Sequence, residues 1–335
     1  MKKPFFLIIT LFLVSTVKTQ TVPSDSAKAE LKKTNAEIVG LYQQKKYDEA
    51  LPLAQKAVLA TEQIFGRDNL ETALALRNLA YIQLAKNDAK AAEDTFEKAY
   101  DVYKKMPDLD KANGSSLADM LESLAFIKYQ KRIDSAESLY ETALSWREKS
   151  DGADSIKAAK SLSALGNISY WRKDYKKSSA LFERLLEILS KNLGTADNET
   201  KLAYRRTECA YRKAGREADF EPVKEKFSQK SATPKPDAPL SPTSINAGVI
   251  NGKAVNLAKP AYPSEARQVR AGGKVEVQVL IDEQGNVVFA CAITAAHPAL
   301  IEGSEAAAYR SKFAPTILQG KPIRVFGTLI YYFVP

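Results

Sequence analysis

Few side chains in this sequence could carry acid–base, nucleophilic or metal chemistry. The 335 residues include one histidine, His297, and two cysteines, Cys209 and Cys291. Multi-histidine zinc sites, four-cysteine zinc sites and iron–sulfur clusters need more ligands than this chain supplies. A Ser-His-Asp or Cys-His enzyme would have to use His297, and nothing in the sequence nominates a nucleophile beside it. We therefore expect no enzyme, no catalytic residue, no metal and no cofactor.

The two cysteines are too few for a disulfide-rich scaffold. Cys209 lies on a helical pattern and is expected to be a small core residue. Cys291 is expected to be structural rather than a reactive thiol. Because a linker separates them, the two cysteines need not pair with each other.

The composition is that of ordinary globular domains, with 45% hydrophobic and 27% charged residues. The net charge of +9 divides into +3 over residues 1–20, +2 over residues 21–229 and +4 over residues 230–335. No segment concentrates positive charge as a nucleic-acid footprint would, so no nucleic acid is expected as a partner. The length predicts two or three domains.

Residues 1–20 have the layout of an export signal. Two lysines precede a largely apolar run over residues 5–14. This run is shorter than the roughly 20 residues of a membrane-spanning helix, and it fits a secretory signal peptide. Residues 17–19 form a tolerable but poor cleavage site, so both cleavage and retention as a short anchor stay open. In either case we expect the rest of the chain to be exported.

Residues 29–229 repeat a helical pattern with a period of about 42 residues. Apolar residues recur at helical spacing, with few glycines and little strand signal. Small residues stand at equivalent positions 42, 44 and 42 residues apart, namely Ala50, Ala92, Ala136 and Ser178. Loops recur in the same register, as Gly66-Arg-Asp68, Gly152-Ala-Asp154 and Gly194-Thr-Ala-Asp197. Glycine suits the end of one helix and aspartate the start of the next.

The clearest copies of the repeat carry a resemblance to a known family. Their shared residues are Leu162-x-x-Leu165-Gly166, Tyr175-x-x-Ser178 and Phe182, with Leu76-x-x-Leu79-Ala80, Ala92, Phe96 and Ala99. They resemble the tetratricopeptide repeat (TPR) family. The usual TPR period is 34 residues, and the longer period here resembles the kinesin-light-chain type. The resemblance implies an all-α solenoid of about five helix pairs that binds a protein ligand, which the sequence does not identify.

The repeat array ends in an atypical unit and a linker. Phe220 replaces the small residue of the fifth unit and Pro222 is expected to interrupt its second helix, so we expect a capping repeat. Four prolines over residues 230–244 favour extended polyproline geometry. This linker predicts a boundary between the array and a second domain over residues 245–335.

Residues 245–335 change to the pattern of strands. The expected elements are an Asn-Gly hairpin over 249–255, strands over 274–281 and 287–293, a helix over 298–312 with Leu300 and Ala307 on one side, and a long strand over 323–333. Together they predict a small α+β domain with an antiparallel sheet.

Spaced motifs across this second domain carry a second resemblance. They are Pro260-Ala-Tyr262-Pro263-x-x-Ala266-Arg267, Gly273-x-Val275-x-Val277-x-Val279-x-Ile281-Asp282-x-x-Gly285, His297-Pro298-x-Leu300, Phe313-x-Pro315, Gly320-x-Pro322, Gly327 and Tyr331-x-Phe333. They resemble the carboxy-terminal domain of the TonB family. The resemblance implies helices on one face of a small antiparallel sheet and a periplasmic location in a Gram-negative bacterium. It also implies that the last strand pairs with a short extended segment, the TonB box, of an outer-membrane receptor.

Two motif residues have a structural interpretation. His297 precedes a proline at a helix start, and the resemblance implies that it is structural. Tyr262 and Pro263 are expected to fix the turn into the first helix of the domain rather than to contact a partner.

The last strand has two distinct faces. One phase is expected to face the helix and consists of Ile323, Val325, Leu329, Tyr331 and Phe333. The other phase holds the candidate peptide-binding residues, Arg324, Phe326, Thr328, Ile330 and Tyr332. If the strand lies at the sheet edge, its unpaired N–H and C=O groups invite strand addition by a peptide. The second face is unusually apolar, which indicates a cover, and the intramolecular alternative is the hairpin near residues 248–257 packed there or occupying the edge.

Two functions follow from the resemblances. The first is an exported interaction protein whose TPR array binds one partner and whose second domain binds another. The alternative is a membrane-anchored energy transducer for outer-membrane transport, but transducers of this family carry an uncleaved membrane helix with a histidine, and residues 1–20 have none. Expected partners are a receptor segment or another envelope protein and an unidentified TPR ligand; a homodimer is left open.

Overall fold

The computed structural model describes residues 25–106, 108–129, 133–229, 244–318 and 320–335. The expected export signal and nearly all of the proline-rich linker lie outside these residues. No helix in the described part of the chain is both long and apolar enough to span a membrane.

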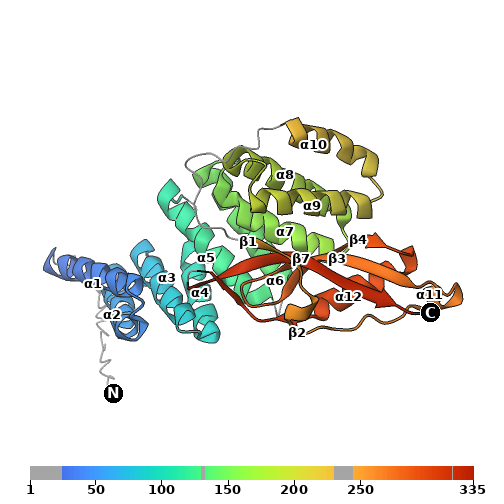
Figure 1. Cartoon of the computed structure of the whole chain (residues 1–335). Coiled ribbons are helices and arrows are strands. Elements are labelled where there is room, and N and C mark those ends of the chain that lie inside the picture. The colour runs from blue at the N-terminus through green and yellow to red at the C-terminus, as the bar shows by residue number, and fades with distance from the viewer. Residues whose placement is uncertain (1–24, 107, 130–132, 230–243, 319) are drawn as a thin grey trace, which may run out of the picture. The chain divides into compact units, whose positions relative to one another are not determined.

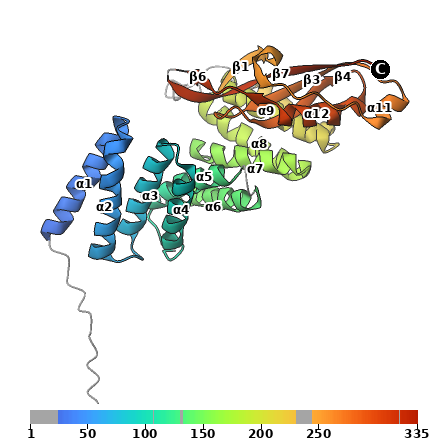
Figure 2. The same cartoon turned by 90° about the horizontal axis from the view of Figure 1, so that it is seen from below.

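The helices of the described residues form consecutive antiparallel pairs (Figures 1 and 2). Their bounds are α1 Asp25–Gln43, α2 Tyr47–Phe65, α3 Leu70–Ala85, α4 Ala89–Tyr103, α5 Lys111–Tyr129, α6 Ile133–Asp151, α7 Ala159–Trp171, α8 Tyr175–Leu193, α9 Asn198–Lys213 and α10 Glu217–Gln229. This confirms the expected helical solenoid of about five pairs. The chain divides into two compact units, Met1–Lys105 with α1–α4 and Met106–Pro335 with all later elements.

The small residues of the repeat are where paired helices touch. Ala50, Ala92, Ala136 and Ser178 are each 0% exposed. Ser178 Oγ donates a hydrogen bond to the backbone oxygen of Gly166 at 2.9 Å. Larger side chains at these positions would push the helices apart, which explains the repeated small residues.

The loops between helices follow the expected chemistry, with one shift. Gly66 and Gly194 end α2 and α8 with positive φ values of 89° and 84°, where glycine has no steric penalty. Asp197 caps α9 by accepting hydrogen bonds from two backbone N–H groups of its first turn. In the other two loops the capping side chain is one residue later than expected, Asn69 for α3 and Ser155 for the 3₁₀ turn η1, Ile156–Ala158.

The expected interruption at Pro222 is wrong, because α10 continues through this residue. Phe220, the large residue at the small-residue position, is buried. Its ring lies 5.4 Å from the ring of Tyr204 and 5.7 Å from that of Tyr211, measured between centroids. Pro222 has no backbone N–H and so removes one hydrogen bond from α10. The aromatic contacts of Phe220 nevertheless hold this last helix against α9.

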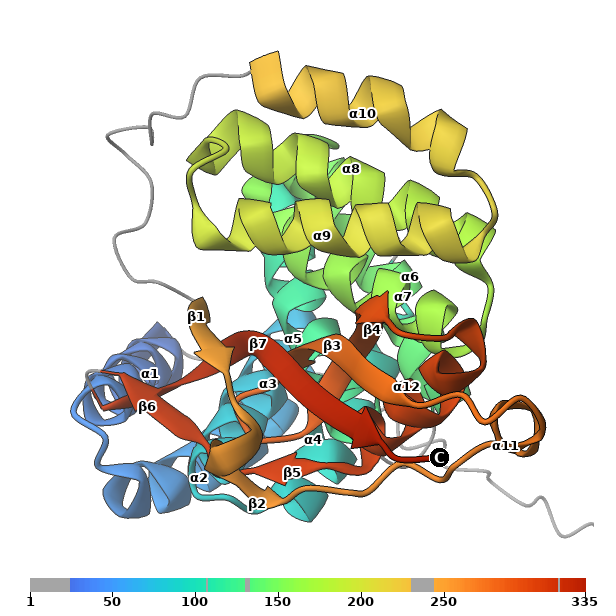
Figure 3. The same cartoon turned by 45° about the vertical axis from the view of Figure 1, so that its right-hand side comes forward.

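The C-terminal domain is built on a sheet with strand order β1–β7–β3–β4 (Figure 3). The strands are β1 Ser244–Val249, β2 Ala254–Asn256, β3 Gly273–Ile281, β4 Val287–Ala295, β5 Lys312–Phe313, β6 Thr316–Leu318 and β7 Lys321–Phe333. The helical elements are η2 Asn251–Lys253, α11 Ser264–Gln268, η3 Pro298–Leu300 and α12 Ile301–Arg310. β3 runs antiparallel to both β4 and β7, whereas β1 runs parallel to β7. The small α+β domain is therefore confirmed.

The hairpin expected around the Asn-Gly pair is wrong. β1 pairs with β7, and β2 pairs with β5 in a separate two-stranded sheet. Asn251 and Gly252 lie instead in the short turn η2. Side-chain hydrogen bonds from Asn251 to β7, described below, favour this turn over a local hairpin.

The sheet lies between two layers of helix. α12 packs on one face, where Leu300 and Ala307 are buried beside Val325 and Leu329, as expected. α7, α8 and α9 pack on the opposite face (Figures 1 and 3). The helical array and the C-terminal domain thus share a core within Met106–Pro335.

Candidate functional site

The long strand β7 has a neighbouring strand on each side for part of its length. β3 pairs with it continuously, from Ile281 opposite Val325 to Gly273 opposite Phe333. β1 pairs with its other side between Arg324 and Thr328. The condition for peptide addition, a strand at the edge of the sheet, is therefore not met over residues 324–328. Part of the intramolecular alternative holds, because a segment of the same chain occupies this side, although it is β1 and not the expected hairpin.

Asn251 continues the pairing where β1 ends. Its Nδ2 donates to the backbone oxygen of Ile330 at 2.7 Å, and its Oδ1 accepts from the backbone nitrogen of Ile330 at 2.8 Å. One side-chain amide thus imitates a neighbouring strand. Ile250 beside it is buried and its backbone nitrogen donates to Thr328.

The five candidate peptide-binding residues have different surroundings. Phe326 is only 2% exposed, whereas Tyr332 is 73% exposed. Arg324, Thr328 and Ile330 are half-buried. They share one phase of β7, as the alternation predicts, but the structure does not bring them together as one open surface.

The apolar second face of β7 is covered by the helical array. Phe326 belongs to a buried cluster with Leu280, Phe289 and Cys291 of the sheet. The helices contribute the other members of this cluster, which include Leu162, Tyr170, Phe182, Leu202 and Cys209. The unusual apolarity of this face is thus explained by contact between the two domains.

Phe289 is the centre of this contact. Its ring lies 4.7 Å from the ring of Tyr170 and 5.9 Å from that of Phe182, the second in an edge-to-face arrangement. Such pairs contribute about 0.5–1.5 kcal/mol each beyond the apolar area they bury. Burial and the nearby Glu305 raise the pKa of Tyr170, so its hydroxyl stays neutral in this interface.

Charged pairs surround the apolar contact. Lys213 Nζ lies 2.8 Å from a carboxylate oxygen of Glu305, and both side chains are largely buried. Glu305 also accepts a hydrogen bond from the backbone nitrogen of Ala292 on β4. Lys173 and Glu302 form a more exposed pair at 2.7 Å, and exposed pairs contribute little.

A disulfide joins Cys209 of α9 to Cys291 of β4. The expectation that Cys209 is a core residue is confirmed, but the expectation that the cysteines need not pair does not describe this structure. Docking of the sheet brings their Cα atoms within 6.5 Å of each other across 82 residues of sequence. Arg212 donates to Ala292 O at 2.5 Å beside the disulfide.

The family-motif residues lie at turns and in the core of the domain. Gly273 and Gly285 have positive φ, at the start of β3 and in the turn after it. Phe313 of β5 is buried in the core of the domain. The remaining motif residues lie around short turns and include Pro260, Tyr262, Pro263, His297, Pro298 and Pro315.

Two of these residues have the structural roles expected of them. His297 Nδ1 accepts from the backbone nitrogen of Ala299 and caps η3. The Tyr262 hydroxyl donates to the backbone oxygen of Ala271 at 3.0 Å, which ties the turn before α11 to the start of β3. No group of three or more potential metal ligands lies close together among the described residues.

Sequence models of two families match the chain. The tetratricopeptide-repeat model matches residues 39–105 and 116–191. The model of the C-terminal domain of the Gram-negative bacterial TonB protein matches residues 258–335. These segments agree with the helical array and the small α+β domain.

Curated relatives match about half of the chain. They include clustered mitochondria protein homologs from Emericella nidulans, 28% identical, and Aspergillus niger, 26% identical, each over 162 residues. The matched part is 48% of this chain and 13% of each relative, so the chain spans about an eighth of the length of these proteins.

Solved structures that align with part of this chain include kinesin-light-chain-like proteins. BtubC (BKLC) from P. vanneervenii aligns with a TM-score of 0.44 at 17% identity, over 64% of this chain and 95% of that one. A putative kinesin light chain from Podosopora anserina aligns with a TM-score of 0.45 at 15% identity, over 59% and 93%.

Proposed function

We propose that this chain, which carries tetratricopeptide repeats and a TonB C-terminal domain, is an exported protein that binds other proteins of the cell envelope. Both families are non-enzymatic scaffold or transducer domains, which supports an interaction role rather than catalysis. In the proposed mechanism, an extended segment of an outer-membrane receptor pairs with β7 in place of β1. Main-chain hydrogen bonds then supply affinity.

The weak hold of β1 is the observation that carries this mechanism. β1 has six residues, and its register with β7 is irregular between Asn246 and Val249. Only Ser244 of the strand is buried, and Val249 is 59% exposed. A strand that buries so little apolar surface costs little to displace.

The anchor that follows β1 limits how far a partner strand would reach. Ile250 is buried and Asn251 makes two hydrogen bonds to Ile330. We expect this anchor to stay in place while β1 leaves. The side of β7 from Arg324 to Thr328 then becomes the receptor-binding edge. Of the binding residues proposed from the sequence, Arg324, Phe326 and Thr328 keep their role through their backbone groups, whereas Ile330 stays bound to Asn251.

Ile245→Asp is expected to raise the affinity for such a peptide about tenfold. Ile245 is the larger of the two half-buried β1 side chains that pack against the domain core, beside Ala247, and a carboxylate against this apolar core should release the strand. The peptide then no longer has to displace β1, because the variant has lost the conformation in which β1 competes for β7. Fluorescence anisotropy with labelled peptides that copy the TonB-box segments of the host's outer-membrane receptors measures the effect.

Val249→Asp provides the matched control, because it adds the same charge to the same strand at an exposed position. We expect its affinity to equal that of the wild type. Equal affinities for Ile245→Asp and Val249→Asp, or no binding by either, would contradict displacement of β1.

The disulfide supports export, because such bonds persist in oxidising compartments such as the periplasm. We expect the mature chain, expressed in a Gram-negative host, to begin near residues 19–22 and to fractionate with soluble periplasmic proteins. N-terminal sequencing of the fractionated protein measures this. An intact Met1 in the inner membrane would instead support the anchored energy transducer.

The partner of the repeats is proposed to bind the helices α1–α4. In Met106–Pro335, α7 and α9 already hold the sheet through their buried residues. The helices α1–α4 belong to the other unit and are the part of the array that we assign to a further protein ligand.

A further inference from the structure

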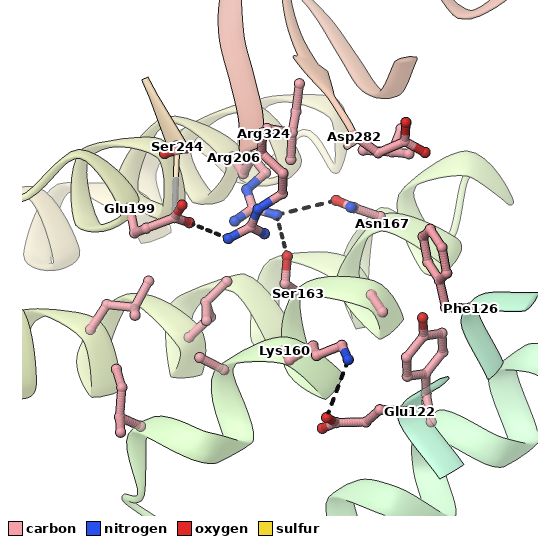
Figure 4. Close-up of a pocket in the computed structure, with 18 of the residues that line it drawn as sticks. Glu122, Phe126, Lys160, Ser163, Asn167, Glu199, Arg206, Ser244, Asp282 and Arg324 are labelled. Carbon is pink, nitrogen blue, oxygen red and sulfur yellow. Dashed lines mark hydrogen bonds and ion pairs between the residues drawn. The ribbon is translucent and has the colours of Figure 1, made fainter. Parts of the chain in front are cut away.

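A cavity of about 790 Å³ lies within Met106–Pro335, between the helices and the C-terminal domain. Its helical walls come from α5 to α9 (Figure 4). The sheet domain closes it with Ser244, Leu280, Asp282, Val288 and Arg324. The cavity exists because the sheet is docked on the helices, and its volume is typical of sites for small ligands.

Arg206 of α9 is the polar centre of one end of this cavity. The residue is 1% exposed. Its Nη1 donates to Ser163 Oγ at 2.8 Å and to Asn167 Oδ1 at 3.4 Å (Figure 4), and its guanidinium lies 5.0 Å from the ring centre of Phe182. Its Nε has no hydrogen-bond partner. The side chains that bind this buried cation are therefore neutral.

The adjacent charges do not balance Arg206. Arg324 lies near it and forms an ion pair with Glu199 at 2.9 Å. The cavity lining also includes the carboxylates of Asp197 and Asp282, but the carboxylate paired with Arg324 is that of Glu199. Burial and repulsion from Arg324 lower the pKa of Arg206 to about 9, against the weaker opposite effect of Glu199. A buried cation of this kind is costly unless an anion joins it.

The cations Arg147 and Lys160 at the other end of the cavity are already paired with carboxylates. Arg147 contacts Asp119 and lies 3.3 Å from Glu122. Lys160 lies 3.7 Å from Glu122. The walls between the two ends are largely apolar and include Leu185, Leu189, Leu193, Leu280 and Val288.

We propose that this cavity binds a carboxylate that carries an apolar chain, with Arg206 as the anchor for the carboxylate. Arg206 offers the charge-assisted hydrogen bonds, and Ser244 Oγ, fully buried and without a partner, adds a polar group beside the cavity. The leucine and valine walls receive the apolar chain. A free fatty acid and the C-terminus of a peptide with apolar last residues both have this chemistry. The proposal does not depend on strand exchange at β7.

Calorimetric titration of the full-length oxidised protein tests the site with two probes. One is decanoate, with decanol as its uncharged control. The other is an N-acetylated tripeptide with two apolar C-terminal residues, as the free acid and as the C-terminal amide. We expect at least one acid to bind and its uncharged counterpart to bind at least tenfold more weakly. The acid that binds more tightly identifies the source of the ligand.

Arg206→Met is the decisive variant, because it keeps side-chain length and removes the charge. We expect acid binding to fall at least tenfold while the midpoint of thermal unfolding without ligand stays equal or rises, since removal of an uncompensated buried charge is often stabilising. Lys160→Met is the matched control, because this lysine is exposed and paired with Glu122. It should bind the acids as the wild type does. Failure of both acids to bind at millimolar concentration, or equal binding by Arg206→Met, would overturn the proposal.

Discussion

Replacement of both Cys209 and Cys291 by serine is expected to lower the free energy of unfolding of Met106–Pro335 by about 4 kcal/mol. The disulfide joins residues 82 positions apart. In the chain-entropy account, a cross-link that closes a loop of this length stabilises the folded state by roughly 4–5 kcal/mol, and measured losses for native disulfides are about 2–5 kcal/mol. The midpoint of urea unfolding, followed by circular dichroism, measures the change.

Reductant provides an internal control for this prediction. Dithiothreitol should lower the urea midpoint of the wild type to that of the double serine variant and leave the variant unchanged. An engineered protease site within residues 230–243 adds a direct test. After cleavage, the two fragments should migrate together on a denaturing gel until reductant is added. Separation without reductant, or unchanged stability of the serine variant, would contradict the bond.

The repeats could be predicted from sequence because their determinants are local. Ala50, Ala92, Ala136 and Ser178 keep a constant spacing, and their burial follows from the close approach of paired helices. The alternation of β7 likewise separated Val325 and Leu329, which face α12, from Phe326. Helical and strand periodicity each report which side chains face a core.

The contact between the two domains could not be predicted because it joins residues on opposite sides of the linker. The pairing of Cys209 with Cys291 depends on how the sheet docks, which no local pattern encodes. The apolar second face of β7 was the available signal that a cover exists, but it did not identify the helices as that cover. Arg206 gave no signal, because a helical arginine usually lies at the surface.

The prediction of a hairpin over residues 249–255 failed for a different physical reason. The Asn-Gly pair at residues 251–252 is a strong local hairpin signal, but Asn251 uses its side chain to pair with Ile330. A long-range contact therefore overrides the local preference. Nothing in the sequence pattern distinguishes an asparagine that forms a turn from one that imitates a strand.

Phe289→Ala is expected to lower the free energy of unfolding by about 3–5 kcal/mol, the usual cost of emptying a buried aromatic site. Phe289 is buried against Tyr170 and Phe182 of the helices. The chain has two tryptophans, Trp146 in helix α6 and Trp171 in helix α7. Tryptophan fluorescence during urea unfolding therefore reports on the helical array, although the substitution is in the sheet.

The two probes of unfolding distinguish a core that both domains share from two domains that unfold independently. If the domains unfold together, Phe289→Ala should lower the urea midpoint seen by tryptophan fluorescence as much as the midpoint seen by circular dichroism. Tyr332→Ala is the matched control, because it removes an exposed aromatic ring from the same side of β7 as Phe326. This variant should leave both midpoints unchanged. An unchanged fluorescence midpoint in Phe289→Ala would mean that the helices do not gain stability from the sheet. Because Phe289 and Cys291 lie on the same strand and contact the same helices, we expect the losses from Phe289→Ala and from the serine variant to be non-additive.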